Sequence, residues 1–141
     1  QRQMCIRDSI IGGCITIPHK ENVLEFFNDY DESVDRIGAA NWFKIEKSKI
    51  KGFNTDCEGF EKCIPNSLFK NISKKKCIIF GAGGSSKAVT EALYRNKVKD
   101  LTIVNSTQTK AKLISDKNKH IKIKIIDIKK IKCLNGKNKK A

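Results

Sequence analysis

A chain of 141 residues suits a single domain or a piece of a larger protein, and its hydrophobic content of 39% is sufficient for a core. It contains no run of roughly 18 apolar residues, so no membrane span is predicted. The formal net charge of +14 invites a nucleic-acid-binding interpretation, but the lysines are spread over nearly every segment. The densest stretch, residues 117–140, has no aromatic side chain on which a base could stack, so we interpret the charge as solvated surface.

The cysteine pattern predicts thiols rather than a metal centre. The six cysteines form no C-x-x-C pair, and no histidine lies at the spacing of a metal ligand. We therefore expect free cysteines in a reducing, cytoplasmic compartment and predict no metal site.

The N-terminal residues predict a leader, a strand and a helix in turn. The first nine residues, QRQMCIRDS, differ from everything that follows and lack the apolar stretch of a secretory signal, so we expect an artefactual leader outside the fold. Residues 15–17 predict the end of a short strand, and Pro18 predicts the first turn of a helix that reaches about Asn28. Lys20 would lie in that turn, where the helix dipole disfavours a positive charge, and this costly placement hints at function.

The next segments predict short elements up to a boundary. Residues 31–37 predict a helix that Asp31 caps and Gly38 ends. Residues 41–54 alternate weakly in polarity on either side of positions 47 and 48, which predicts a hairpin. A helix is expected through Ile64, and residues 65–75 form a polar connector between domains.

The most informative stretch is a strand, a glycine-rich turn and a helix. Cys77–Phe80 is an unbroken apolar run, typical of a strand buried on both faces of a parallel sheet. In the following G-A-G-G-S-S, Gly81 permits a tight turn, Gly83 lets a pyrophosphate approach the backbone, and the small Ser86 allows close packing. The apolar residues that follow mark one face of a helix, whose N-terminus offers N–H groups to phosphates. They are Ala88, Val89, Ala92 and Leu93. This context favours dinucleotide binding over a glycine turn that merely ends a strand.

The remaining sequence extends the same α/β pattern. Residues 101–104 predict a second strand, parallel to the first and reached by a right-handed crossover. Ala111 and Ile114 mark a further helix, and residues 121–128 could form a third strand. Residues 129–141 predict no element.

Several separated motifs, in order, resemble those of the shikimate dehydrogenase family, whose members reduce 3-dehydroshikimate with NADPH. They are Thr16-Ile17-Pro18-His19-Lys20, Gly38-Ala39-Ala40-Asn41, Asn54-Thr55-Asp56 with Gly59, Gly81-Ala82-Gly83-Gly84-Ser85, and Asn105-Ser106-Thr107. The similarity covers about residues 12–115, and the motifs are specific together rather than singly.

The resemblance implies a role for each matched position. Lys20 falls on the family's catalytic lysine and Asp56 on its partner, and these two would bind substrate together with Thr16 and Asn41. The pyrophosphate loop falls on Gly81, Ala82, Gly83, Gly84 and Ser85. The segment that holds the adenosine 2′-phosphate falls on Asn105, Ser106, Thr107 and Lys110, and Glu32 aligns with a cofactor-side glutamate. The expected cofactor is NADP.

The residue types agree with this chemistry but do not require it. A ketone that receives a hydride needs a proton on its oxygen, and a lysine can deliver one if a carboxylate orients it. From the residues alone, the alternative is a surface Lys20–Asp56 ion pair with no catalytic role. No acidic residue follows Asn105 until Asp116, which favours NADP over NAD because a carboxylate there would repel a 2′-phosphate.

The resemblance also carries departures. Cys14, Trp42, Cys57 and Ser106 stand where the family has Asn, Thr, Gly and Arg. The family's substrate-carboxylate site and the rest of its cofactor domain have no counterpart here, so the resemblance implies the middle of a longer enzyme, and we expect the 141 residues alone to be inactive.

The implied architecture is α/β. Residues 10–65 would be the C-terminal part of an α/β substrate-binding, catalytic domain, 66–75 the connector, and 76–141 the first half of a Rossmann-type parallel sheet that binds NADP.

The implied function is an NADP-dependent shikimate dehydrogenase of aromatic amino-acid (chorismate) biosynthesis. We expect a cytoplasmic enzyme with a small-molecule substrate, no nucleic-acid or membrane partner, and a possible homodimer when intact. Two alternatives stay open: a relative that uses quinate or aminoshikimate, separable by substrate kinetics, and a basic nucleic-acid-binding module, separable by a salt-dependent gel shift.

Overall fold

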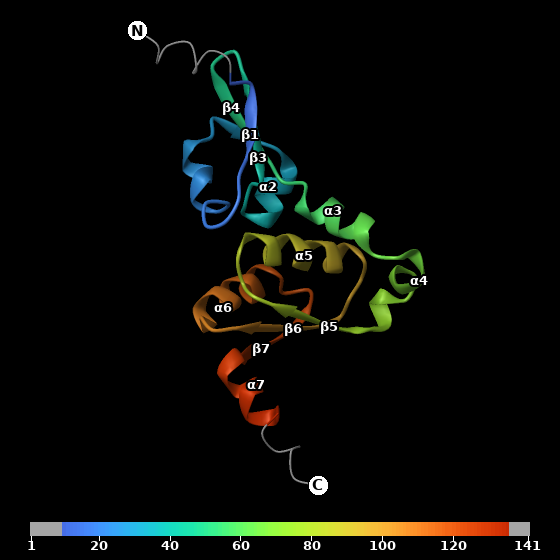
Figure 1. The fold of residues 1–141 in the computed structure, drawn as a ribbon. Helices are drawn as coiled ribbons and strands as arrows, with labels where there is room; N and C mark the ends of the chain where they lie inside the picture. The colour runs from blue at the N-terminus through green and yellow to red at the C-terminus, as the bar shows by residue number, and fades with distance from the viewer. Residues whose placement is uncertain (1–9, 136–141) are drawn as a thin grey trace.

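A computed structural model describes residues 10–135 and places them in two sheets with helices between them (Figure 1). The N-terminal unit holds β1 (Gly12–Cys14), η1 (Asn22–Phe26), β2 (Asp29–Tyr30), α2 (Glu32–Ile37), β3 (Trp42–Glu46), β4 (Lys49–Phe53) and α3 (Asp56–Cys63). The C-terminal unit holds β5 (Lys76–Phe80), α5 (Gly84–Arg95), β6 (Asp100–Asn105), α6 (Gln108–Lys117), β7 (Lys122–Asp127) and α7 (Ile128–Asn135). The two short helices α4 (Asn66–Phe69) and η2 (Ile72–Lys74) connect the two units along the chain.

The N-terminal sheet has the strand order β1-β3-β4-β2 and is built around the predicted hairpin. β3 and β4 pair antiparallel, and the turn residues Lys47 and Ser48 have φ angles of 49° and 62°. Left-handed conformations at both turn positions match the twist of the flanking strands, which confirms the hairpin. β2, which the sequence analysis did not predict, adds a short parallel pair beside β4.

The expected strand at residues 15–17 was wrong in its position. β1 lies earlier, at Gly12–Cys14, and only the Ile15 N–H continues the pairing, by donating to the Asn41 carbonyl at 2.7 Å. The reason is close packing: a Cβ on Gly12 would lie 2.5 Å from the Phe43 carbonyl oxygen, so this position needs glycine. Glycine normally weakens strands, so the sequence pattern favoured the apolar residues 15–17 over the two glycines before them.

The helix expected from Pro18 to about Asn28 was also wrong. Residues 17–21 form a turn in which the His19 N–H donates to the Thr16 carbonyl at 2.9 Å, and only the short 3₁₀ helix η1 follows. Lys20 therefore lies in the turn and not in the first turn of a helix.

The predicted helix at residues 31–37 is confirmed as α2. The Asp31 carboxylate accepts hydrogen bonds from the N–H groups of Ser33 and Val34, as an N-cap does. Gly38 ends the helix with φ 71°, which glycine adopts without a steric penalty.

The connector has more structure than expected. α3 ends at Cys63, and the Pro65 carbonyl then accepts hydrogen bonds from Leu68 and Phe69 N–H groups at 2.9 and 3.0 Å, which starts α4. The proline ring fixes φ near the helical value, so Pro65 can precede α4. Proline also cannot continue a helix, so α3 ends before it.

The C-terminal sheet is parallel with the order β5-β6-β7, as the strand–helix–strand pattern predicts. The third strand is confirmed, and α7 appears where no element was predicted, with residues 136–141 outside the described range. The core of this unit lies between the sheet and helices α5 and α6. Its largest members include Leu93, Leu101, Ile103 and Ile114.

The prediction that the first Rossmann-type strand is buried on both faces was wrong. Ile79 points into the core, but Ile78 and Phe80 are 60% and 68% exposed. The reason lies in the arrangement of the described residues, because α5 and α6 cover the same face of the sheet (Figure 1). An apolar run alone cannot tell one covered face from two.

Helix α5 packs against both units. One side packs on the parallel sheet, and the other packs on α2 and α3, where Ala88 and Ala92 contact Ile37 and Cys57. The sequence predicted one buried apolar face for this helix, but the structure also buries the polar residues Thr90 and Glu91. Within residues 10–135, every helix is too short or too polar to traverse a bilayer.

Candidate active site

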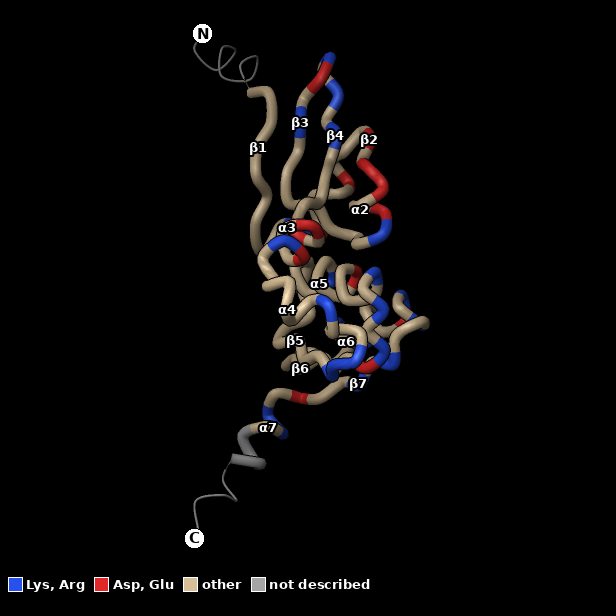
Figure 2. The backbone as a smooth tube through the Cα atoms, turned by 90° about the vertical axis from the view of Figure 1, so that its right-hand side faces the viewer, with Lys and Arg blue, Asp and Glu red and all other residues tan. Residues whose placement is uncertain are grey.

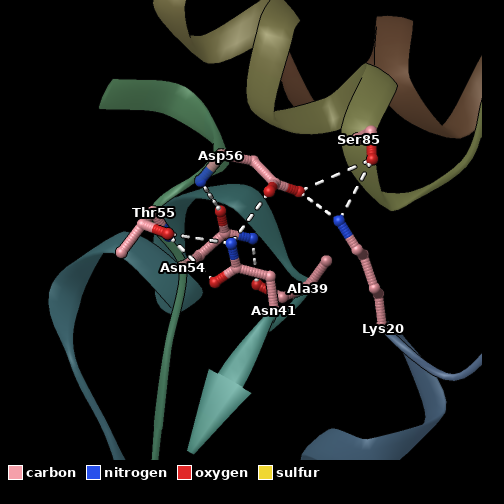
Figure 3. A network of polar contacts seen from close by, with 7 residues as sticks. All are labelled: Lys20, Ala39, Asn41, Asn54, Thr55, Asp56 and Ser85. Atoms are coloured by element: carbon pink, nitrogen blue, oxygen red, sulfur yellow. Dashed lines mark hydrogen bonds and ion pairs between the residues drawn. The ribbon is translucent and has the colours of Figure 1, made fainter. Parts of the chain in front are cut away.

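An ion pair between Lys20 and Asp56 lies at the meeting point of the two units (Figure 3). The Lys20 Nζ donates to Asp56 Oδ2, and the side chains are 13% and 24% exposed. Lys20 comes from the turn after β1, and Asp56 is the first residue of α3. The structure thus brings together two residues that are 36 positions apart, in a partly buried setting rather than on open surface.

Asparagine side chains hold the Asp56 carboxylate and its backbone. Asn41 Nδ2 donates to Asp56 Oδ1 at 2.8 Å, and the Asp56 N–H donates to Asn54 Oδ1 at 3.0 Å. Asn54 is 4% exposed, and its Nδ2 donates to the Ala39 carbonyl at 2.7 Å. These bonds fix the loop after α2 against the start of α3, so they set the position of Asp56.

Asn41 uses most of its hydrogen-bonding capacity inside this network. Its Nδ2 also donates to Thr55 Oγ1 at 2.9 Å, and its Oδ1 accepts from the Thr55 N–H at 3.0 Å. One lone pair of Oδ1 remains for a ligand. The predicted contact of Asn41 with substrate therefore stays a prediction, as does that of Thr16, whose side chain is exposed.

Ser85 reaches the pair from the other unit. Its Oγ accepts from Lys20 Nζ at 3.2 Å and donates to Asp56 Oδ2 at 3.5 Å (Figure 3). Sequence reasoning assigned Ser85 only to the glycine turn, and it did not identify Asn54 as a group that orients Asp56. The Asn-Thr-Asp spacing was the signal for Asn54, since an asparagine two residues before an N–H commonly accepts from it.

The glycine turn has the geometry that a pyrophosphate needs. Gly81 has φ 111°, and a Cβ added to Gly83 would meet no atom within 4 Å, so an approaching group would find that side of the backbone open. No side chain caps α5, and the N–H groups of Gly84 and Ser85 are in its first turn, where they lack intrahelical partners. The turn therefore fits an anionic phosphate at a helix N-terminus.

The end of β6 lies at the same carboxyl edge of the sheet as the glycine turn. Asn105 Nδ2 donates to the Thr107 carbonyl at 2.8 Å, which shapes the loop, while Ser106, Thr107 and Lys110 are exposed. The cofactor-side role of Glu32 stays a prediction. Its carboxylate pairs with Arg36 on the same helix at 2.7 Å and is 80% exposed.

Cys57 and Trp42, two departures from the family pattern, pack beside the site. Cys57 is 1% exposed, and burial raises the pKa of its thiol, so it adds no charge next to Asp56. Trp42 stacks on Phe53 with ring centroids 4.4 Å apart at the base of the hairpin.

Two further observations concern candidate metal ligands and the distribution of charge. Residues 10–135 contain no cluster of three or more side chains that could hold a metal ion. Lys and Arg are distributed over both units and interleaved with Asp and Glu (Figure 2).

A family model, curated relatives and several solved structures point to one family. The family model described as shikimate / quinate 5-dehydrogenase matches residues 64–138. A shikimate dehydrogenase (NADP(+)) from Clostridium botulinum strain Hall is 38% identical over 125 residues, which cover 87% of this chain and 46% of that protein. The solved shikimate dehydrogenase of Aquifex aeolicus superposes with a TM-score of 0.73 at 29% identity, covering 89% of this chain and 47% of that one. That of Thermus thermophilus, in complex with NADP(H) and shikimate, has a TM-score of 0.68 at 26% identity, with coverages of 89% and 46%. The chain thus spans about half the length of the curated relatives it matches.

Proposed function

The chain belongs to the shikimate/quinate 5-dehydrogenase family, and we propose that the full-length protein is an NADP-dependent enzyme that interconverts 3-dehydroshikimate and shikimate. The observation that carries this proposal is the partly buried Lys20–Asp56 pair beside a glycine turn whose open side fits a pyrophosphate. Residues 10–65 would form the substrate side and residues 76–141 the cofactor side, with 66–75 between them.

The proposed chemistry assigns the proton to Lys20. When bound, NADPH supplies a hydride to the ketone carbon. The carbonyl oxygen then takes a proton from the Lys20 ammonium, which Asp56 holds and orients. Asn41 and Asn54 keep the carboxylate in place, so the proton donor does not have to be repositioned in each turnover. Lys20 recovers a proton from water, which reaches its partly exposed side chain.

The cofactor side is proposed to hold NADP through the backbone and a short polar loop. The N–H groups at the start of α5 would bind the pyrophosphate. The exposed Ser106, Thr107 and Lys110 would face the 2′-phosphate, where no carboxylate opposes them before Asp116. Cys14, Cys57, Cys63 and Cys77 are free thiols, which supports a reducing, cytoplasmic location. A homodimer stays a prediction that sedimentation of the full-length protein tests.

Two substitutions and a matched control test the proposal in the full-length protein. Lys20→Ala and Asp56→Asn should each lower kcat for 3-dehydroshikimate by about 10²–10⁴-fold, followed as loss of NADPH absorbance. The double variant should lose little more than either single one, since each residue acts through the other. NADPH affinity, measured by fluorescence titration, should not change.

The control is Lys51→Ala. It removes a surface ion pair in which Lys51 Nζ lies 2.7 Å from Asp29 Oδ2. It should leave kcat unchanged. If Lys20→Ala also keeps kcat near that of the wild type, the proposed role is wrong. Faster turnover of quinate or an aminoshikimate substrate would move the protein to another activity of the family, and salt-dependent DNA binding without turnover would support the nucleic-acid alternative.

A further inference from the structure

The Ser85 side chain joins the cofactor turn to the proton-donating lysine. Its hydroxyl accepts from Lys20 Nζ at 3.2 Å and donates to Asp56 Oδ2 at 3.5 Å, so it bridges both members of the pair. Lys20 and Ser85 are 65 positions apart, and they belong to different units of the fold. Of the small side chains that fit at the start of a helix, only one with a hydroxyl can make this bridge.

The backbone around Ser85 is arranged for close approach to Lys20. A Cβ on Gly84 would lie 3.1 Å from the Lys20 Cβ and 3.2 Å from the Ala39 Cβ, so glycine lets the end of α5 pack tightly against the lysine segment. Further along α5, Lys87 pairs with Glu21 at 2.6 Å and Glu91 with Arg36 at 3.4 Å. The apolar packing of Ala88 and Ala92 against α2 and α3 holds α5, and with it Ser85, at a fixed position relative to Lys20.

The backbone and the side chain of Ser85 serve different partners. The Ser85 N–H lies in the first turn of α5, where it is available to an anion. The hydroxyl bonds to Lys20 and Asp56 (Figure 3). Loss of the hydroxyl would therefore leave the phosphate-binding backbone intact.

An ammonium group has three N–H donors, and the structure uses two of them. One N–H bonds to Asp56 and one to Ser85. Because the ammonium group is tetrahedral, these two bonds fix the direction of the third N–H. We propose that Ser85 is a positioning residue that directs this third N–H of Lys20 toward the substrate carbonyl oxygen. This inference rests on the proposed function of Lys20 as proton donor.

The test compares three variants of the full-length protein. Ser85→Ala should lower kcat about three- to tenfold, the effect expected of one lost hydrogen bond, with KM and Kd for NADPH unchanged. Ser85→Thr keeps a hydroxyl and should recover most of kcat. Lys87→Met, the matched control, removes another polar contact of α5 with the N-terminal unit and should leave kcat unchanged.

A second readout does not depend on turnover. Competitive acetic anhydride labelling, read by mass spectrometry, should modify Lys20 several-fold faster in Ser85→Ala than in the wild type or in Lys87→Met. Unchanged labelling would overturn the inference, and so would a rise in Kd for NADPH with kcat unchanged, which would make Ser85 a cofactor contact. Faster labelling in a protein without any dehydrogenase turnover would keep the contact but reject the proposed function.

Discussion

Replacing Asn54 with alanine tests how the structure holds Asp56. Asn54 is 4% exposed and makes two side-chain hydrogen bonds, to the Ala39 carbonyl at 2.7 Å and from the Asp56 N–H at 3.0 Å. Ala39 is fully buried, so its carbonyl would lose its partner where water does not reach. An orphaned buried group costs about 1–3 kcal/mol, and the more accessible Asp56 N–H adds roughly 0.5–1 kcal/mol.

We therefore expect Asn54→Ala to lower the free energy of unfolding by about 1.5–4 kcal/mol. In a full-length protein this corresponds to a fall in Tm of roughly 3–16 °C by differential scanning calorimetry. The kcat should fall too, because Asp56 loses a fixed backbone, but less than in Asp56→Asn, because the carboxylate remains.

Asn28→Ala is the matched control for this experiment. Asn28 is exposed and its Oδ1 accepts one hydrogen bond, from the Ile50 N–H at 2.8 Å, so its loss should lower Tm only slightly. The reasoning is refuted if Asn54→Ala melts within a degree of Asn28→Ala and keeps the wild-type kcat.

Two further predictions concern the cofactor and the thiols. Ser106→Arg should tighten NADPH binding by about tenfold or more relative to NADH, because a guanidinium forms charge-assisted hydrogen bonds with a phosphate and a serine does not; an equal gain for both cofactors in side-by-side titrations would contradict it. Cys57 should resist iodoacetamide at pH 8 while the exposed Cys14 and Cys63 react, since it is 1% exposed and burial raises the pKa of its thiol. The raised pKa slows alkylation because the thiol stays neutral, and therefore unreactive, up to a higher pH. Peptide mass spectrometry that finds Cys57 alkylated as fast as Cys63 would refute this prediction.

Short-range features of this fold could be predicted because their causes lie within a few residues. The Asp31 cap and the Gly38 end of α2 depend on neighbouring N–H groups and on one φ angle. The hairpin at residues 41–54 depends on its two turn residues, and the glycine turn depends on adjacent strand and helix patterns. The site pair Lys20 and Asp56 was identified through family motifs, and the structure places the two side chains in contact.

Features that depend on distant residues were decided only by the tertiary structure. β1 lies at Gly12–Cys14 because of how closely β3 approaches, and Ile78 and Phe80 are exposed because both α5 and α6 pack on the opposite face. The Ser85 hydroxyl meets Lys20 only because Gly84 lets α5 pack against the lysine turn. The sequence by itself thus determined the capped helix α2, the hairpin and the glycine turn, and its family motifs indicated the candidate chemistry. The meeting of side chains 36 and 65 positions apart depended on the packing of whole helices and sheets, which no local pattern specifies.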